Sequence, residues 1–215
     1  VVFEDFPYPV HHLHGNVAFS PERATFSNVQ GRHNKNILKV AGEWTPENFD
    51  IHITSDHFLI EDDLYHALPH DGKELWKQFQ VQGNTKVKIH VLKEENKDIV
   101  WNTEISLINI QGKYLEFPYE LQNLQGLVTF NHESHAQFNL KNHTDKVNVN
   151  ISGEYTKDKF SLLVHARDLF LDDALYNALT KEHQNIWKKL TPLGKMDVKF
   201  NYQKEDNIAK QKKDV

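Results

Sequence analysis

The chain lacks several residues and patterns on which common functions are built. It has no cysteine among its 215 residues, which excludes disulfides and any zinc or redox site made of thiolates. No stretch reaches the roughly 20 consecutive apolar residues that a membrane-spanning helix needs. The net charge of −5 provides no broad basic surface, so we expect no nucleic acid among the partners. The lack of cysteine fits the cytoplasm and the periplasm equally well.

The chain nevertheless has the large apolar residues that a folded core requires. It contains thirteen Phe, seven Tyr and four Trp, which argues against wholesale disorder. The sequence opens on "VVFEDF", which begins with Val and reads as the end of a strand, and no signal peptide is visible. We therefore expect an internal segment of a larger protein.

An internal duplication organises the sequence. "FPYPVHHLHGNVAF" at 6–19 matches "FPYELQNLQGLVTF" at 117–130, a shift of 111 residues, and the same shift aligns "IEDDLYHAL" at 60–68 with "LDDALYNAL" at 171–179. Chance does not preserve one register over such a length. The sequence predicts two tandem repeats, at 1–111 and 112–204, followed by a disordered tail at 205–215.

Each repeat alternates apolar and polar residues with a period of two. In "NFDIHIT" at 48–54 the apolar residues Phe49, Ile51 and Ile53 alternate with polar ones, and "KMDVKFNY" at 195–202 does the same. This period is typical of antiparallel strands with one apolar face and one solvated face. A short helical insert is expected at about 62–80 and again at about 173–191. The predicted fold class is mainly β (α+β), with the repeats forming a continuous curved sheet or groove.

Three histidines lie close together in "HHLH" at 11–14. His12 and His14, two positions apart on a strand, would point to one face and could bind a metal. Their equivalents in the second repeat are Asn123 and Gln125, however, and His52 and His90 are likewise replaced by Leu163 and Asn201. We interpret the histidines as residues of a solvated strand face and predict no metal site. A metal-dependent or hydrolytic enzyme that uses this strand is the alternative.

Other candidate sites have simpler structural interpretations. The acidic pairs Glu61–Asp62 and Asp172–Asp173 precede helical patterns, so we expect them to cap helices rather than to catalyse a reaction. The repeated "FPY" and the matched residues Trp76 and Trp187 are expected to pack in the core. No phosphate-binding loop, nucleophile elbow or His-Glu-x-x-His motif occurs. We predict no catalytic residue, no cofactor and no enzymatic activity.

The order "FPY…L.G.V.F", "GEW", "LDD.LY.AL" and "W…L.P.G…V" resembles the AsmA-like superfamily, which includes TamB. It is similar above all to the large AsmA-like envelope proteins of planctomycete-type bacteria, over nearly all of residues 6–204. The resemblance implies a β-rich, non-enzymatic segment of a periplasmic or cell-envelope protein that acts in lipid transfer or outer-membrane biogenesis. It also implies a membrane anchor elsewhere in the parent chain, and a phospholipid or other acyl-chain lipid and further envelope proteins as partners.

The groove that this resemblance implies would have an apolar lining. The candidate lining residues come from the alternating strands of both repeats: Ile51, Ile53, Val87, Ile89, Leu162, Val164, Val198 and Phe200. The same residues could equally form an ordinary core. The competing hypothesis is therefore a closed β-sandwich module that scaffolds a partner protein and has a filled, dry core.

Overall fold

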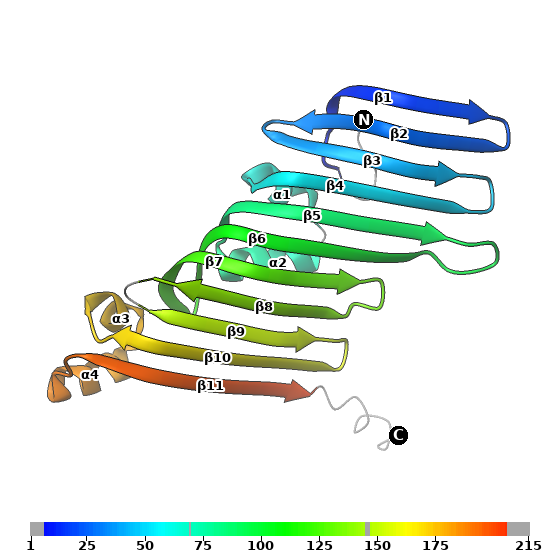
Figure 1. Ribbon diagram of the computed structural model, residues 1–215. Coiled ribbons are helices and arrows are strands. Elements are labelled where there is room, and N and C mark those ends of the chain that lie inside the picture. The colour runs from blue at the N-terminus through cyan, green and yellow to red at the C-terminus, as the bar shows by residue number, and fades with distance from the viewer. Residues whose placement is uncertain (1–6, 69, 145–146, 206–215) are drawn as a thin grey trace, which may run out of the picture.

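The computed structural model describes residues 7–68, 70–144 and 147–205, which form one open antiparallel sheet of eleven strands in sequence order (Figure 1). The strands are β1 (His11–Ser20), β2 (Arg23–His33), β3 (Asn36–Trp44), β4 (Phe49–Ile60), β5 (Gln82–Lys93), β6 (Val100–Tyr114), β7 (Phe117–Asn131), β8 (Ala136–His143), β9 (Asn148–Tyr155), β10 (Lys159–Phe170) and β11 (Lys195–Glu205). The prediction of a mainly β fold with a continuous sheet is confirmed. Because the sheet is a single open layer, the closed β-sandwich is wrong for the described residues.

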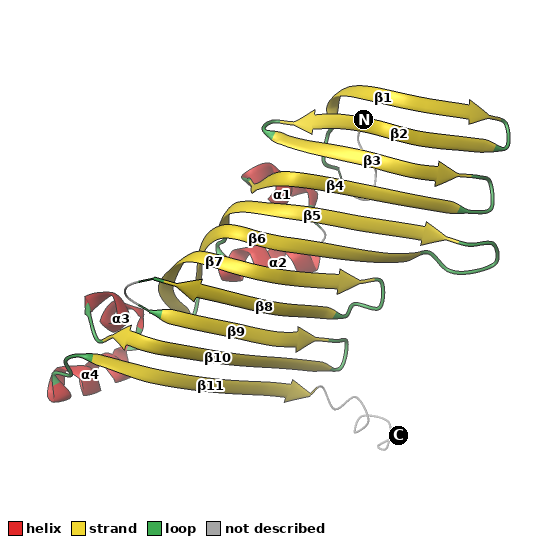
Figure 2. Ribbon diagram, viewed as in Figure 1, coloured by secondary structure: helices red, strands yellow, loops and turns green. Residues whose placement is uncertain are grey.

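In the described part of the chain, four short helices interrupt the succession of strands (Figure 2). The helices α1 (Asp62–Ala67) and α2 (His70–Phe79) connect β4 to β5, and α3 (Asp173–Ala178) and α4 (Lys181–Leu190) connect β10 to β11. Each predicted insert thus holds two helices. The break lies at Leu68 and at Leu179, whose extended backbone ends the first helix of each pair.

The duplication is visible as a repeated order of elements. Shifting the chain by 111 residues carries β1–β4 onto β7–β10, the first helix pair onto the second, and β5 onto β11. Strand β6 lies between them and pairs with both β5 and β7. The repeat boundary at 111/112 falls inside β6, so the repeats are parts of one sheet. Strand β11 includes Glu205, and the rest of the expected tail, 206–215, lies outside the described residues.

Both helix pairs lie behind the same face of the sheet and at the same end of its strands (Figure 1). Two buried clusters mark where they pack. The first contains Tyr8, Phe58 and Ala67, and the second is formed by Val147, Val149, Ala166, Leu169 and Leu175. Because burial of apolar surface stabilises a fold by about 25 cal/mol per Å², these two clusters anchor the sheet at its helix end.

Candidate functional site: the apolar face of the sheet

Strand register aligns apolar side chains into rows that cross the sheet. Residues directly opposite each other on antiparallel strands project from the same face. One row crosses β5 to β11 and consists of Val87, Ile105, Val128, Phe138, Gly153, Leu162 and Tyr202. A second row crosses β1 to β6 and consists of Val17, Phe26, Gly42, Ile51, Val91 and Trp101. Together the rows make one face of all eleven strands apolar, and we call it the apolar face.

All eight candidate lining residues lie on the apolar face. In the first repeat Ile51 pairs with Val91 and Ile53 with Ile89, while Val87 lies opposite Ser55. In the second repeat the pairs are Leu162 with Tyr202, Val164 with Phe200, and Ala166 with Val198. Seven of the eight are half-buried and Phe200 is 49% exposed, so none belongs to the fully buried core.

The helices cover only part of this face. Val87 packs against the first buried cluster, and Val164 and Val198 pack against the second. Large side chains elsewhere on the face remain more than a third exposed, among them Val17, Phe19, Trp44, Trp101, Tyr155, Phe200 and Tyr202. Soluble proteins rarely expose a contiguous apolar surface of this kind unless it binds something.

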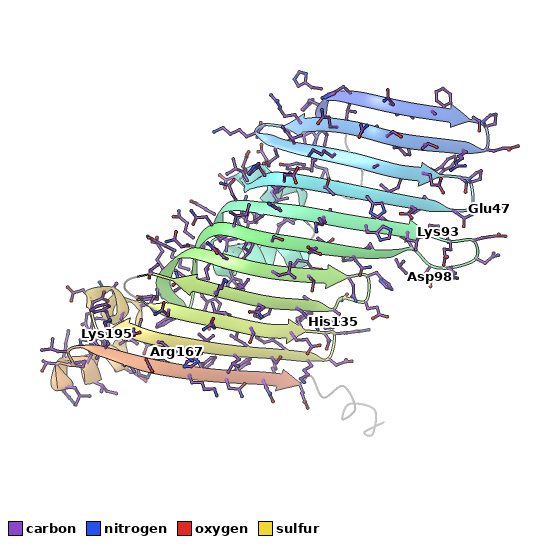
Figure 3. All side chains as sticks on the ribbon, in the orientation of Figure 1. Glu47, Lys93, Asp98, His135, Arg167 and Lys195 are labelled. Atoms are coloured by element: carbon purple, nitrogen blue, oxygen red, sulfur yellow. The ribbon has the colours of Figure 1, made fainter. Side chains whose placement is uncertain are left out.

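The opposite face and the turn end of the sheet are polar. Ion pairs join Lys39 to Asp56 at 2.6 Å and Lys88 to Glu104 at 3.2 Å on the face turned away from the helices. Figure 3 shows Glu47, Lys93 and Asp98 at the turns opposite the helix end. The alternation in the sequence therefore gives the sheet one polar, solvent-exposed face and one apolar face.

The strand that carries "HHLH" has a bulge at its histidines. His12 has a left-handed backbone, with φ of 53°, and the register of β1 shifts on both sides of His14. This bulge disrupts the simple alternation on which the metal hypothesis depended. His12 and His14 border an open recess of about 460 Å³, and the ring of His14 contacts the Gln30 amide. Asn123, the equivalent of His12, has the same left-handed backbone conformation, with φ of 58°. This position therefore has the same conformation in both repeats, whichever side chain it carries.

The acidic pairs differ between the repeats. The carboxylate of Asp172 accepts a hydrogen bond from the Leu175 N–H at 3.0 Å and caps α3, as expected. Glu61 precedes α1 but makes no side-chain cap, and this part of the prediction is wrong. Its carboxylate accepts a hydrogen bond from Asn34 instead, at 2.9 Å.

A cluster of polar side chains joins α1 to the end of β2 and to the segment before β1. Asp63 accepts hydrogen bonds from Asn34 at 3.0 Å and from His33 at 3.1 Å, and these bonds lower the pKa of its carboxyl. The other ring nitrogen of His33 lies 2.7 Å from the Pro9 carbonyl oxygen. Burial raises the pKa of the nearby Tyr8 phenol, and a bond from Asn36 partly opposes that shift. With both ring nitrogens engaged, His33 has a structural role.

The "FPY" residues and the two matched tryptophans are buried to different degrees. Tyr8 is buried, while Tyr119 and Trp187 are half-buried against the second cluster. Trp76 is half-buried, with its ring 6.1 Å from that of Tyr65. Phe117 is 41% exposed and so does not pack in the core, and Phe6 lies outside the described residues.

One cluster of ligand-type side chains was not anticipated from the sequence. Asp50, His52 and His90 place one carboxylate oxygen and two ring nitrogens within 4.8 Å of one another on the polar face. The sequence shows that Asp50 and His52 are two residues apart on one strand. It does not show that His90 is their partner, because His90 lies 38 residues beyond His52 and only the register of β4 and β5 places it opposite His52.

Searches against protein-family models, curated proteins and solved structures found no match to this chain. Among the described residues, no helix is both long and apolar enough to cross a membrane.

Proposed function

We propose that the uncovered part of the apolar face binds the acyl chains of a phospholipid, as one segment of an apolar groove in an AsmA-like envelope protein. In this role the chain is not an enzyme. It shields lipid tails as they move between membranes or contributes to outer-membrane biogenesis. The observation that carries the proposal is the unbroken apolar face across eleven strands, with helices over only one end of it.

The dimensions and chemistry of the face suit a hydrocarbon chain. Eleven strands at about 4.8 Å spacing give a surface roughly 48 Å wide. A fully buried methylene contributes about 0.8 kcal/mol, and a chain lying on this open face gains part of that for each methylene. Acyl chains have no hydrogen-bonding groups, and the two rows described above present almost exclusively aliphatic, aromatic and glycine positions. A flexible chain can therefore bind without leaving a polar group unpaired.

The margin of the face suits a phospholipid headgroup. Lys93 lies opposite Phe49 and Lys204 opposite Phe160, so both lysines stand on the apolar face where it reaches the turn end. Cationic side chains at this margin favour an anionic headgroup kept in water while its tails lie on the sheet.

Photo-crosslinking with a matched pair of positions tests the proposal. A benzophenone side chain is introduced at Ile53, on the apolar face, or at Thr54, the next residue and on the polar face. Each protein is incubated with phosphatidylglycerol vesicles and irradiated. We expect lipid adducts at position 53 and at most a background level at position 54. Equal labelling at the two positions, or none at either, contradicts the proposal.

Native mass spectrometry with organic extraction tests whether lipid accompanies the purified protein. We expect a phospholipid or fatty acid at near-stoichiometric level, and less of it in Phe200→Asp than in the charge-matched control Asn201→Asp. Phe200 is 49% exposed, so its replacement disturbs the ligand surface more than the core. A folded protein without lipid in either assay would instead favour a partner protein as the occupant of this face.

A further inference from the structure

We propose that Asp50, His52 and His90 form a binding site for a divalent first-row transition metal ion of the zinc class. The site lies on the polar face of β4 and β5. It is independent of the proposed lipid function, because the lipid surface is on the other side of the sheet.

The three side chains converge because of strand geometry. Asp50 and His52 are two residues apart on β4 and therefore project from the same face, and His90 lies directly opposite His52 on β5. The Nε2 atoms of His52 and His90 lie 3.2 Å and 2.9 Å from the same carboxylate oxygen, Oδ1 of Asp50. The two imidazole rings stack with their centroids 4.2 Å apart and only 7° between their planes.

These distances match the edges of a metal coordination polyhedron. Ligand atoms about 2.1 Å from a tetrahedral Zn²⁺ are about 3.4 Å from each other, and an octahedral site has edges of about 3.0 Å. The two contacts of the Asp50 oxygen, at 3.2 Å and 2.9 Å, fall close to this range. Because the two rings are stacked nearly parallel, they must rotate about their Cβ–Cγ bonds for both nitrogens to face one ion. Two imidazole nitrogens and one carboxylate are a donor set that zinc-class ions prefer over Mg²⁺ and Ca²⁺.

The surroundings leave the site open to an ion. The side chains of Asp50, His52 and His90 are 46%, 54% and 40% exposed, so a water or an external ligand can take the remaining coordination position. The nearby cations have carboxylate partners of their own, since Lys39 pairs with Asp56, Lys88 with Glu104, and Arg23 with Glu43. The ammonium groups of Lys39 and Lys88 are thus held beside those carboxylates.

The second repeat shows that the sheet does not need this cluster. Ser161, Leu163 and Asn201 occupy the equivalent positions, and Leu163 pairs with Asn201 as His52 pairs with His90. The same strand pairing forms there without a single ligand-type side chain. Strand pairing therefore does not require the histidines and the carboxylate of the first repeat, and the metal site would be specific to that repeat.

Zinc titration of the chelator-treated protein, followed by calorimetry at neutral pH, tests this site. The test variant is His52→Leu with His90→Asn, which substitutes the residues that the second repeat uses at the same positions. The control variant is His12→Asn with His14→Gln, which removes two histidines from the other His-rich strand in the same manner. We expect one equivalent of Zn²⁺ bound by the wild type and by the control, and at least about tenfold weaker binding by the test variant.

A second variant and a second signal distinguish loss of the metal site from loss of folding. Asp50→Asn keeps the shape of the side chain and removes its charge, and far-UV circular dichroism verifies the sheet in every variant. With Co²⁺ as a probe, wild-type protein should develop a visible absorption band that Asp50→Asn weakens. The proposal is overturned by no Zn²⁺ binding to the wild type, by unchanged binding to folded test variants, or by loss of binding in the control variant alone.

Discussion

Replacing Asn36 by Val should destabilise the protein by removing a buried hydrogen-bonding hub. Asn36 is completely buried. Its amide nitrogen donates to the Tyr8 hydroxyl at 2.8 Å and to the Leu59 carbonyl at 3.1 Å, and its amide oxygen accepts from the Leu59 N–H at 2.7 Å. These bonds join β3 and β4 to the segment that precedes β1. The equivalent position in the second repeat is Val147, which is buried in an apolar cluster, so valine fits this backbone.

The magnitude follows from the three bonds. Each contributes about 1 kcal/mol net, and valine recovers part of the loss by adding apolar surface, so we expect a decrease of about 2 to 3 kcal/mol in the free energy of unfolding. Urea denaturation followed by circular dichroism measures it, provided that the m value is unchanged. Asn139→Val, at an exposed position of β8, is the control and should change stability by less than about 0.5 kcal/mol. A decrease below about 1 kcal/mol for Asn36→Val would refute the claim that these hydrogen bonds hold the first repeat together.

Three further predictions concern helix capping, pH and backbone conformation. Asp172→Ala should lower stability by about 1 kcal/mol because it removes the cap of α3, whereas Glu61→Ala should not reduce hydrogen-exchange protection of the first turn of α1. The lowered pKa of Asp63 stabilises the fold above the ordinary carboxyl pKa of about 3.9. That contribution is lost as the pH falls through the folded-state value, so Asp63→Asn should flatten the acid limb of a stability–pH curve. Gly42→Ala should cost about 3 kcal/mol or more in urea denaturation, since φ is +144° and a Cβ would overlap the Asp50 carbonyl oxygen. Gly194→Ala has open space around it and should show only the backbone strain of about 1 to 2 kcal/mol.

The two proposals assign different chemistry to the two faces of one sheet. Because successive residues of a strand point to opposite sides, Ile51 and Ile53 serve the apolar face while Asp50 and His52 serve the polar one. A ligand on one face need not displace a ligand on the other. Metal binding and lipid binding can therefore be measured separately on the same protein.

The sequence alone was sufficient for the features that depend on local alternation and on self-similarity. The period of two predicted antiparallel strands and assigned Ile53, Val87 and Phe200 to the apolar side, because side-chain direction follows from the backbone of a single strand. The shift of 111 residues predicted that the same elements would occur twice.

The tertiary structure decided what depends on long-range pairing. Whether the sheet closes depends on which strands pair. Here the strands pair with their sequence neighbours and, among the described residues, β1 and β11 remain the two edges, so the sheet is open. The bulge at His12 and the register that sets His90 opposite His52 come from hydrogen bonds between neighbouring strands, which no single segment encodes. For that reason the sequence drew attention to three closely spaced histidines, while the side chains that converge lie on two strands separated by a pair of helices.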